Sequence, residues 1–151
     1  MCGILLISCS KEEAKSSEVS WDDSPTLVRE VVITDDGKEG NFVFRIGDNG
    51  KLGFAEYGPF IAGEKQKYMW HFWGEPDTLK QPFKVVGISK KTNESITIFE
   101  VSTNNSLVPH LGADHHIPST MTLPGSGKWR LEVYFGEELF GNIIVNVEEK
   151  K

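Results

Sequence analysis

KWRLEVYFGEELFGNIIVNV, residues 128–147, is the stretch that decides the fold. Its first half alternates large apolar side chains with polar ones, which is the pattern of a strand with one buried face. After the polar turn Gly136–Glu138 the alternation resumes, so we expect a hairpin with a short loop. The residues expected on the buried face are Trp129, Leu131, Val133, Phe135, Leu139, Gly141, Ile143, Val145 and Val147.

Other strand signals occur along most of the chain and end at turn residues such as glycine, proline, asparagine or aspartate. They lie at residues 27–33, 41–46, 52–57, 67–74, 83–89, 96–102 and 119–123. No segment shows a clear helical period. The chain is therefore predicted to be all-β, with residues 26–151 forming an antiparallel β-sandwich of about eight to nine strands.

The composition is that of one acidic domain. The chain has 151 residues and a formal net charge of -6, with its 16 lysines and arginines scattered along the sequence. Binding of nucleic acid through phosphate neutralisation needs clustered basic residues, so we expect no nucleic-acid partner. Both cysteines, Cys2 and Cys9, precede the predicted sandwich, which therefore has no thiol to ligate a metal or attack a substrate.

The first nine residues run from apolar to sharply polar at Cys9. Leu6-Ile7-Ser8-Cys9 resembles a bacterial lipobox, and the resemblance implies a diacylglyceryl group on Cys9. No lysine or arginine precedes Cys9, and eight residues are short for a signal peptide. Residues 1–9 are therefore interpreted as the remnant of a signal peptide that begins upstream. The alternative is an apolar N-terminal strand in a cytosolic protein.

Residues 10–25 are rich in serine, glutamate, lysine and aspartate. Such a segment buries too little surface to offset its ordering entropy, so it is predicted to be a flexible polar tether. No run of about 18 apolar residues occurs, so no transmembrane helix is expected. The protein would then be extracytoplasmic and held at the cell membrane by lipid on Cys9.

The final hairpin resembles the last two strands of bacterial immunoglobulin-like domains, in which a turn glycine and an aromatic residue open the penultimate strand. Gly127 and Trp129 carry this resemblance. Together with the lipobox, the chain is similar to small Gram-positive surface lipoproteins. The resemblance implies an immunoglobulin-like fold, and a fold alone does not fix a function.

The aromatic segment 68–73 is the first candidate site. Large side chains stand on both faces of this predicted strand, and exposed aromatic patches often mark contact surfaces. Its partner-binding residues would be Met69, His71 and Trp73, of which His71 and Trp73 are expected to be exposed. The favoured interpretation is different: a central strand with the core on one face and a covering loop on the other.

The second candidate is the loop 103–118, the longest piece without a pattern. His110, Asp114, His115 and His116 lie within seven residues, and imidazole and carboxylate groups are ligands that suit zinc. With His71 they form a candidate metal site. The spacing matches no common zinc motif, and adjacent histidines point apart on extended backbone. A polar surface loop is the favoured interpretation, and no cofactor is expected.

Catalytic motifs are absent from the sequence. There is no nucleophile elbow, no phosphate-binding glycine loop and no isolated acidic pair. The leading hypothesis is a non-enzymatic, membrane-anchored module that binds an envelope protein or peptide. A zinc-binding protein and an accessory domain that modulates a membrane partner are the alternatives. The sequence specifies no oligomeric state.

Overall fold

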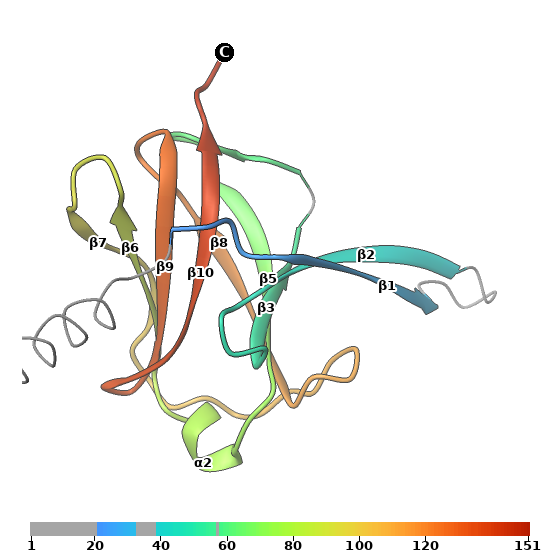
Figure 1. The fold of residues 1–151 in the computed structure, drawn as a ribbon. Helices are drawn as coiled ribbons and strands as arrows, with labels where there is room; N and C mark the ends of the chain where they lie inside the picture. The colour runs from blue at the N-terminus through green and yellow to red at the C-terminus, as the bar shows by residue number, and fades with distance from the viewer. Residues whose placement is uncertain (1–20, 33–38, 57) are drawn as a thin grey trace, which may run out of the picture.

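The computed structural model describes residues 21–32, 39–56 and 58–151 (Figure 1). In this part of the chain, ten strands form two five-stranded sheets, and one short helix connects two of the strands. The predicted all-β sandwich is therefore confirmed. Figure 1 also shows β1 and β2 as a two-stranded arm that extends away from the rest of the sandwich.

The first sheet has the order β1-β2-β3-β5-β8, and every neighbouring pair in it is antiparallel. Its strands are β1 (Thr26–Val32), β2 (Glu39–Ile46), β3 (Leu52–Ala55), β5 (Gln66–Phe72) and β8 (His115–Met121). β5 lies between β3 and β8, so the aromatic segment is an interior strand. β8 begins four residues earlier than the predicted strand at 119–123, because strand pairing with β5 includes the two adjacent histidines.

The second sheet has the order β4-β10-β9-β6-β7. Its strands are β4 (Phe60–Ile61), β10 (Glu138–Glu148), β9 (Gly127–Phe135), β6 (Phe83–Ser89) and β7 (Ser95–Val101). The β9–β10 hairpin forms as the sequence predicts. The expectation of a purely antiparallel fold is wrong at one place, since the two residues of β4 pair parallel to β10.

Aromatic rings dominate the core between the sheets. Trp70, Phe72, Phe83 and Phe135 are each at most 2% exposed. Phe72 meets Phe135 edge-to-face at 4.9 Å between ring centroids and Phe83 at 5.3 Å, which joins the first sheet to the second. Such pairs contribute about 0.5–1.5 kcal/mol beyond the burial of their area. Contacts between strands far apart in sequence therefore hold the two sheets together.

A β-bulge corrects one part of the predicted hairpin. The pairing of β9 with β10 shifts between Leu139 and Gly141, which leaves Phe140 as an extra residue. Phe140 packs against the core and meets Phe135 at 5.2 Å, whereas Leu139 is 49% exposed. The prediction that Leu139 is buried is therefore wrong, because the alternation on which it rests does not continue through a bulge.

The edge of β10 that faces away from β9 is covered along much of its length. Its partners are Ser24 at Ile144, Asp48 at Asn142, Asn49 at Phe140 and Ala62 at Glu148. An unpaired edge of this length would invite pairing with another chain. The packed region therefore includes Ser24, two residues before the predicted domain start at residue 26. Residues 10–20 of the predicted tether lie outside the described residues.

The sequence also missed a short helix, α2 (Pro76–Leu79). Its Pro76 stands in the first turn, where the missing N–H is not needed. Leu79 is fully buried and anchors the helix to the core. Four residues are too few to show a helical period, so this segment reads as a loop.

Candidate functional site

The two faces of β5 have different surroundings. Tyr68, Trp70 and Phe72 point into the core and are at most 2% exposed. His71 lies on the other face and is only 1% exposed, so the expectation that it is exposed is wrong. The favoured interpretation of this strand, with the core on one face and a covering loop on the other, is correct. Met69 and Trp73 are partly buried.

The covering loop is a tight turn at residues 110–113, which we call the 110–113 turn. Its backbone is closed by paired hydrogen bonds between His110 and Ala113 at 3.2 and 2.9 Å. Leu111 and Gly112 have positive φ angles of 50° and 86°. This conformation costs a leucine about 1–2 kcal/mol, so surrounding contacts must hold the turn in place.

Two contacts attach the 110–113 turn to the end of β5. The Trp73 indole Nε1–H donates to the Gly112 carbonyl at 2.9 Å. The Gly74 amide donates to the Asp114 carboxylate at 2.9 Å. Asp114 therefore helps to dock the turn on β5 through its bond to the Gly74 amide.

Three histidines meet on the outer face of the first sheet. His71 on β5 and His116 on β8 are direct cross-strand partners. The 110–113 turn adds His110, whose ring centroid lies 5.2 Å from that of His71 and 4.6 Å from that of His116. The His71 and His116 centroids are 6.2 Å apart. We call these three side chains the histidine cluster.

The hydrogen bonds of the histidine cluster fix its tautomers. His71 Nδ1 lies 3.1 Å from the Met69 carbonyl, and His116 Nδ1 lies 2.8 Å from the Val108 carbonyl. A carbonyl only accepts, so both Nδ1 atoms carry hydrogen. In the neutral state His71 Nε2 is then an acceptor, and His110 Nδ1 donates to it at 3.0 Å.

His115 does not join this cluster. It pairs with Phe72 and is 2% exposed, on the face of β8 that points toward the core. Its Nδ1 accepts from the Val108 amide at 3.0 Å, while its buried Nε2 has no hydrogen-bond partner among the residues that the structure describes. The sequence-based expectation that adjacent histidines point apart is therefore correct, and the predicted ligand set is divided between the two faces of the sheet.

Burial lowers the pKa of two of these histidines. Loss of hydration on burial, and second the nearby charge of His116, lower the pKa of His110. The same two causes, in the same order, lower the pKa of His115. Within the described residues, no three His, Cys, Asp or Glu side chains are arranged as a metal site.

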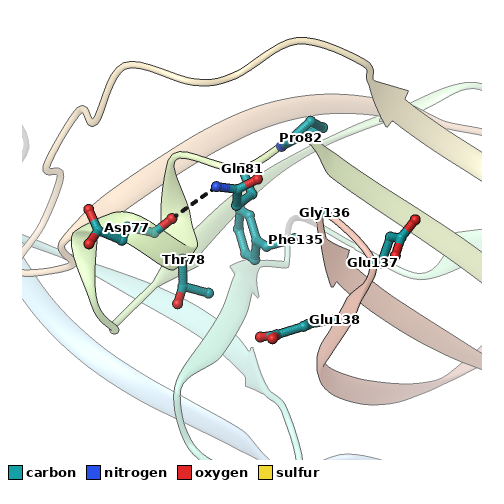
Figure 2. Close-up of a pocket in the computed structure, with 8 residues that line it drawn as sticks. All are labelled: Asp77, Thr78, Gln81, Pro82, Phe135, Gly136, Glu137 and Glu138. Carbon is teal, nitrogen blue, oxygen red and sulfur yellow. Dashed lines mark hydrogen bonds between the residues drawn. The ribbon is translucent and has the colours of Figure 1, made fainter.

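A groove of about 550 Å³ is a further candidate site (Figure 2). It runs between α2 and the β9–β10 turn and carries the carboxylates of Asp77, Glu137 and Glu138. In Figure 2, Glu138 extends toward the side that carries Thr78, whereas Glu137 points away. No sequence pattern predicts this groove, because one of its walls is the helix α2, which was not predicted.

Comparison with known proteins places the chain in a family. A family model for a domain of unknown function, DUF4871, matches residues 12–145. The chain belongs to the DUF4871 family. No curated protein matches this DUF4871 chain.

One solved structure similar to the DUF4871 chain is a crystal structure described as a "Putative Lipoprotein from Bacillus anthracis". The two share 20% sequence identity over 89% of this chain and 91% of the other, with a TM-score of 0.60. At this identity the likeness establishes the shared fold alone. Cys9, the predicted lipidation site, lies outside the described residues.

Proposed function

We propose that this DUF4871 protein is an extracytoplasmic lipoprotein, anchored to the cell membrane through lipid on Cys9. The observation that carries the proposal is Leu6-Ile7-Ser8-Cys9, followed directly by a polar segment. The similar Bacillus anthracis structure, described as a putative lipoprotein, supports it. In the part of the chain that the structure describes, no helix is long and apolar enough to cross a membrane.

The anchored domain acts as a non-enzymatic binding module with an immunoglobulin-like sandwich. Its partner is an envelope protein or peptide, bound through surface groups and not transformed. The acidic groove between α2 and the β9–β10 turn and the partly buried side chains of Met69 and Trp73 are offered to it. An accessory domain that modulates a neighbouring membrane protein is a special case of the same function.

The mature N-terminus tests the anchor directly. The gene is expressed from its native locus in its native host, and the mass of the N-terminal peptide from the membrane fraction is measured. We expect a peptide that begins at Cys9 with added lipid mass. Cys9→Ser should release the protein from membranes, whereas the matched variant Cys2→Ser should leave it anchored. An unmodified chain that retains Met1 would refute the proposal.

Divalent-metal binding is the second proposed function, and the proximity of His71, His110 and His116 favours it. Two of these rings already donate Nδ1–H to backbone carbonyls, as histidine ligands of metals usually do. Nitrogen ligands of tetrahedral zinc lie about 3.3 Å apart. His71 Nε2 and His110 Nδ1 are 3.0 Å apart and share a proton, so the metal would have to replace that proton.

Calorimetric titration with Zn²⁺ tests this second function. The proposal requires micromolar or tighter binding that His110→Ala abolishes. Asp114→Asn is the matched control, because Asn can still accept the hydrogen bond from the Gly74 amide. Equal binding by this variant would confine the ligands to the histidine cluster. Absence of heat with the wild-type protein would exclude the site.

A further inference from the structure

We infer that one end of the sandwich, which we call the lysine end, is a docking surface for anionic membrane lipids. It comprises residues 62–67 around the start of β5, the β6–β7 turn at 90–94, residues 122–128 and the C-terminal residues 148–151. The inference rests on the proposed lipid anchor, which would hold the domain beside such a surface. The acidic groove at the opposite end would then face away from the membrane and stay open to a partner.

Strand directions bring these four segments to one end of the sandwich. β9 begins there, and its antiparallel neighbour β10 ends there. The Lys90 amide donates to the Lys128 carbonyl at 3.0 Å, so the β6–β7 turn lies beside the start of β9. The Gly63 amide donates to the Leu123 carbonyl at 2.8 Å, which adds the segment before β5. Figure 1 shows the C-terminus and the β6–β7 turn at one end and α2 at the other.

Lysine side chains outnumber carboxylates at the lysine end. Its lysines are Lys65, Lys67, Lys90, Lys91, Lys128, Lys150 and Lys151, and its glutamates are Glu64, Glu94, Glu148 and Glu149. Lys150 Nζ lies 3.9 Å from a Glu64 carboxylate oxygen, and Lys128 Nζ lies 3.5 Å from one of Asp23. Ion pairs on the surface are weak, so they leave the lysines able to meet other anions. This end is therefore positive, although the whole chain has a formal net charge of -6.

The opposite end of the sandwich carries the reverse charge. It holds α2, the β9–β10 turn and the residues beside the end of β5, where the Asp114 amide donates to the Phe72 carbonyl at 2.9 Å. Its carboxylates are Glu75, Asp77, Asp114, Glu137 and Glu138, and its lysines are Lys51, Lys80 and Lys84. An anionic surface attracts the lysine end and repels this one. The charge distribution therefore orients a domain that is negative as a whole.

The chain enters the described fold beside the lysine end. Lys128 Nζ donates to the Trp21 carbonyl at 3.0 Å, and the Arg130 guanidinium lies 5.0 Å from the centroid of the Trp21 ring. Eleven residues separate Trp21 from Cys9, and they can span at most about 40 Å. An anchor on Cys9 would keep the lysine end within that distance of the lipid headgroups. A weak attraction then suffices, because tethering raises the effective concentration of the surface.

Several lysines at one end act together on a charged surface. Each lysine that approaches an anionic membrane strengthens binding about fivefold. Salt screens this attraction over about 8 Å at physiological ionic strength, so only side chains close to the headgroups contribute. Lys90 and Lys91 are both exposed in the β6–β7 turn. They can therefore be changed without disturbing the core.

Vesicle sedimentation of the full chain carrying Cys9→Ser tests the docking without the lipid anchor. The vesicles contain phosphatidylglycerol and phosphatidylcholine in equal parts, or phosphatidylcholine alone. We expect binding to the first kind that weakens as salt is raised, and no binding to the second. Lys90→Gln combined with Lys91→Gln should weaken binding by at least about tenfold. Lys51→Gln combined with Lys80→Gln is the matched control, which removes the same charge at the opposite end and should not weaken binding.

Absence of binding to the phosphatidylglycerol vesicles, or an equal loss in both double variants, would overturn the inference. Equal binding to the two kinds of vesicle would also overturn it, because the contact would then be apolar and not electrostatic. These outcomes leave the anchor standing, since the protein tested carries no lipid. Conversely, a mature chain that retains Met1 and has no lipid would refute the anchor and leave the vesicle result unaffected.

Discussion

The buried Ser119 on β8 makes two side-chain hydrogen bonds to β5. These two strands also carry the His71–His116 pair. Ser119 is 2% exposed, and its Oγ accepts from the Trp70 indole at 3.0 Å while donating to the Tyr68 carbonyl at 3.0 Å. Ser119→Ala removes both bonds but very little volume. The fully buried Trp70 N–H is then left without a partner.

The loss in free energy of unfolding comes from this unpaired Trp70 N–H group. Leaving a buried N–H unsatisfied costs about 1–3 kcal/mol. The Tyr68 carbonyl loses only one of its possible donors, so we expect a total near 2 kcal/mol. For a chain of this size, this lowers the melting temperature by about 4–8 °C. Urea unfolding followed by fluorescence gives the free energy directly, provided that the slope with denaturant is unchanged.

A double-mutant cycle isolates the bond. Trp70→Phe removes the indole N–H, so adding Ser119→Ala to it should cost about 1 kcal/mol less than in the wild-type protein. Ser102→Ala, at an exposed position, is the matched control and should change stability by less than about 0.5 kcal/mol. A loss below about 0.5 kcal/mol for Ser119→Ala, or no coupling with Trp70→Phe, would refute this account.

Three further predictions concern the bulge, an ion pair and pH. Gly141→Ala should lower the free energy of unfolding in urea by about 1–3 kcal/mol, because the new Cβ would lie 2.5 Å from Leu52 Cδ2. An unchanged free energy would show that the Leu52 side chain moves aside freely. Arg45→Lys should cost about 1–2 kcal/mol, since lysine cannot reproduce the forked bonds to Glu56 or the added bond to the Ser24 carbonyl. The folded state holds the pKa values of His110 and His115 below the ordinary value of 6.5, so the unfolded chain binds more protons in acid. The free energy of unfolding should be level above pH 6.5 and fall below it, and His110→Asn should reduce that fall; a pH-independent value from 7.5 to 5.5 would contradict this.

The fold class could be predicted because most of its strands have a recognisable local sequence pattern. β9 alternates cleanly in sequence and in burial and ends at turn residues, so periodicity alone finds it. Features that depend on contacts between residues far apart in sequence could not be predicted in this way. β4 has only two residues, which form a strand by pairing with β10. The bulge lets the Phe140 ring pack against Phe72 and Phe135. No local sequence pattern encodes this packing.

The histidine cluster shows where sequence reasoning stops. The sequence places three histidines in one segment and His71 about forty residues earlier, but it does not give the register in which β5 and β8 pair. That register sets His71 opposite His116 and Phe72 opposite His115. A slip of one residue would turn every β8 side chain to the other face and bring His115 to the outer face in place of His116. The site is thus decided by the core residues Trp70 and Ile117, which pair in the same register and must both point inward. Packing of the aromatic core selects which histidines meet, so a variant that shifts this register would dismantle the cluster without changing any histidine.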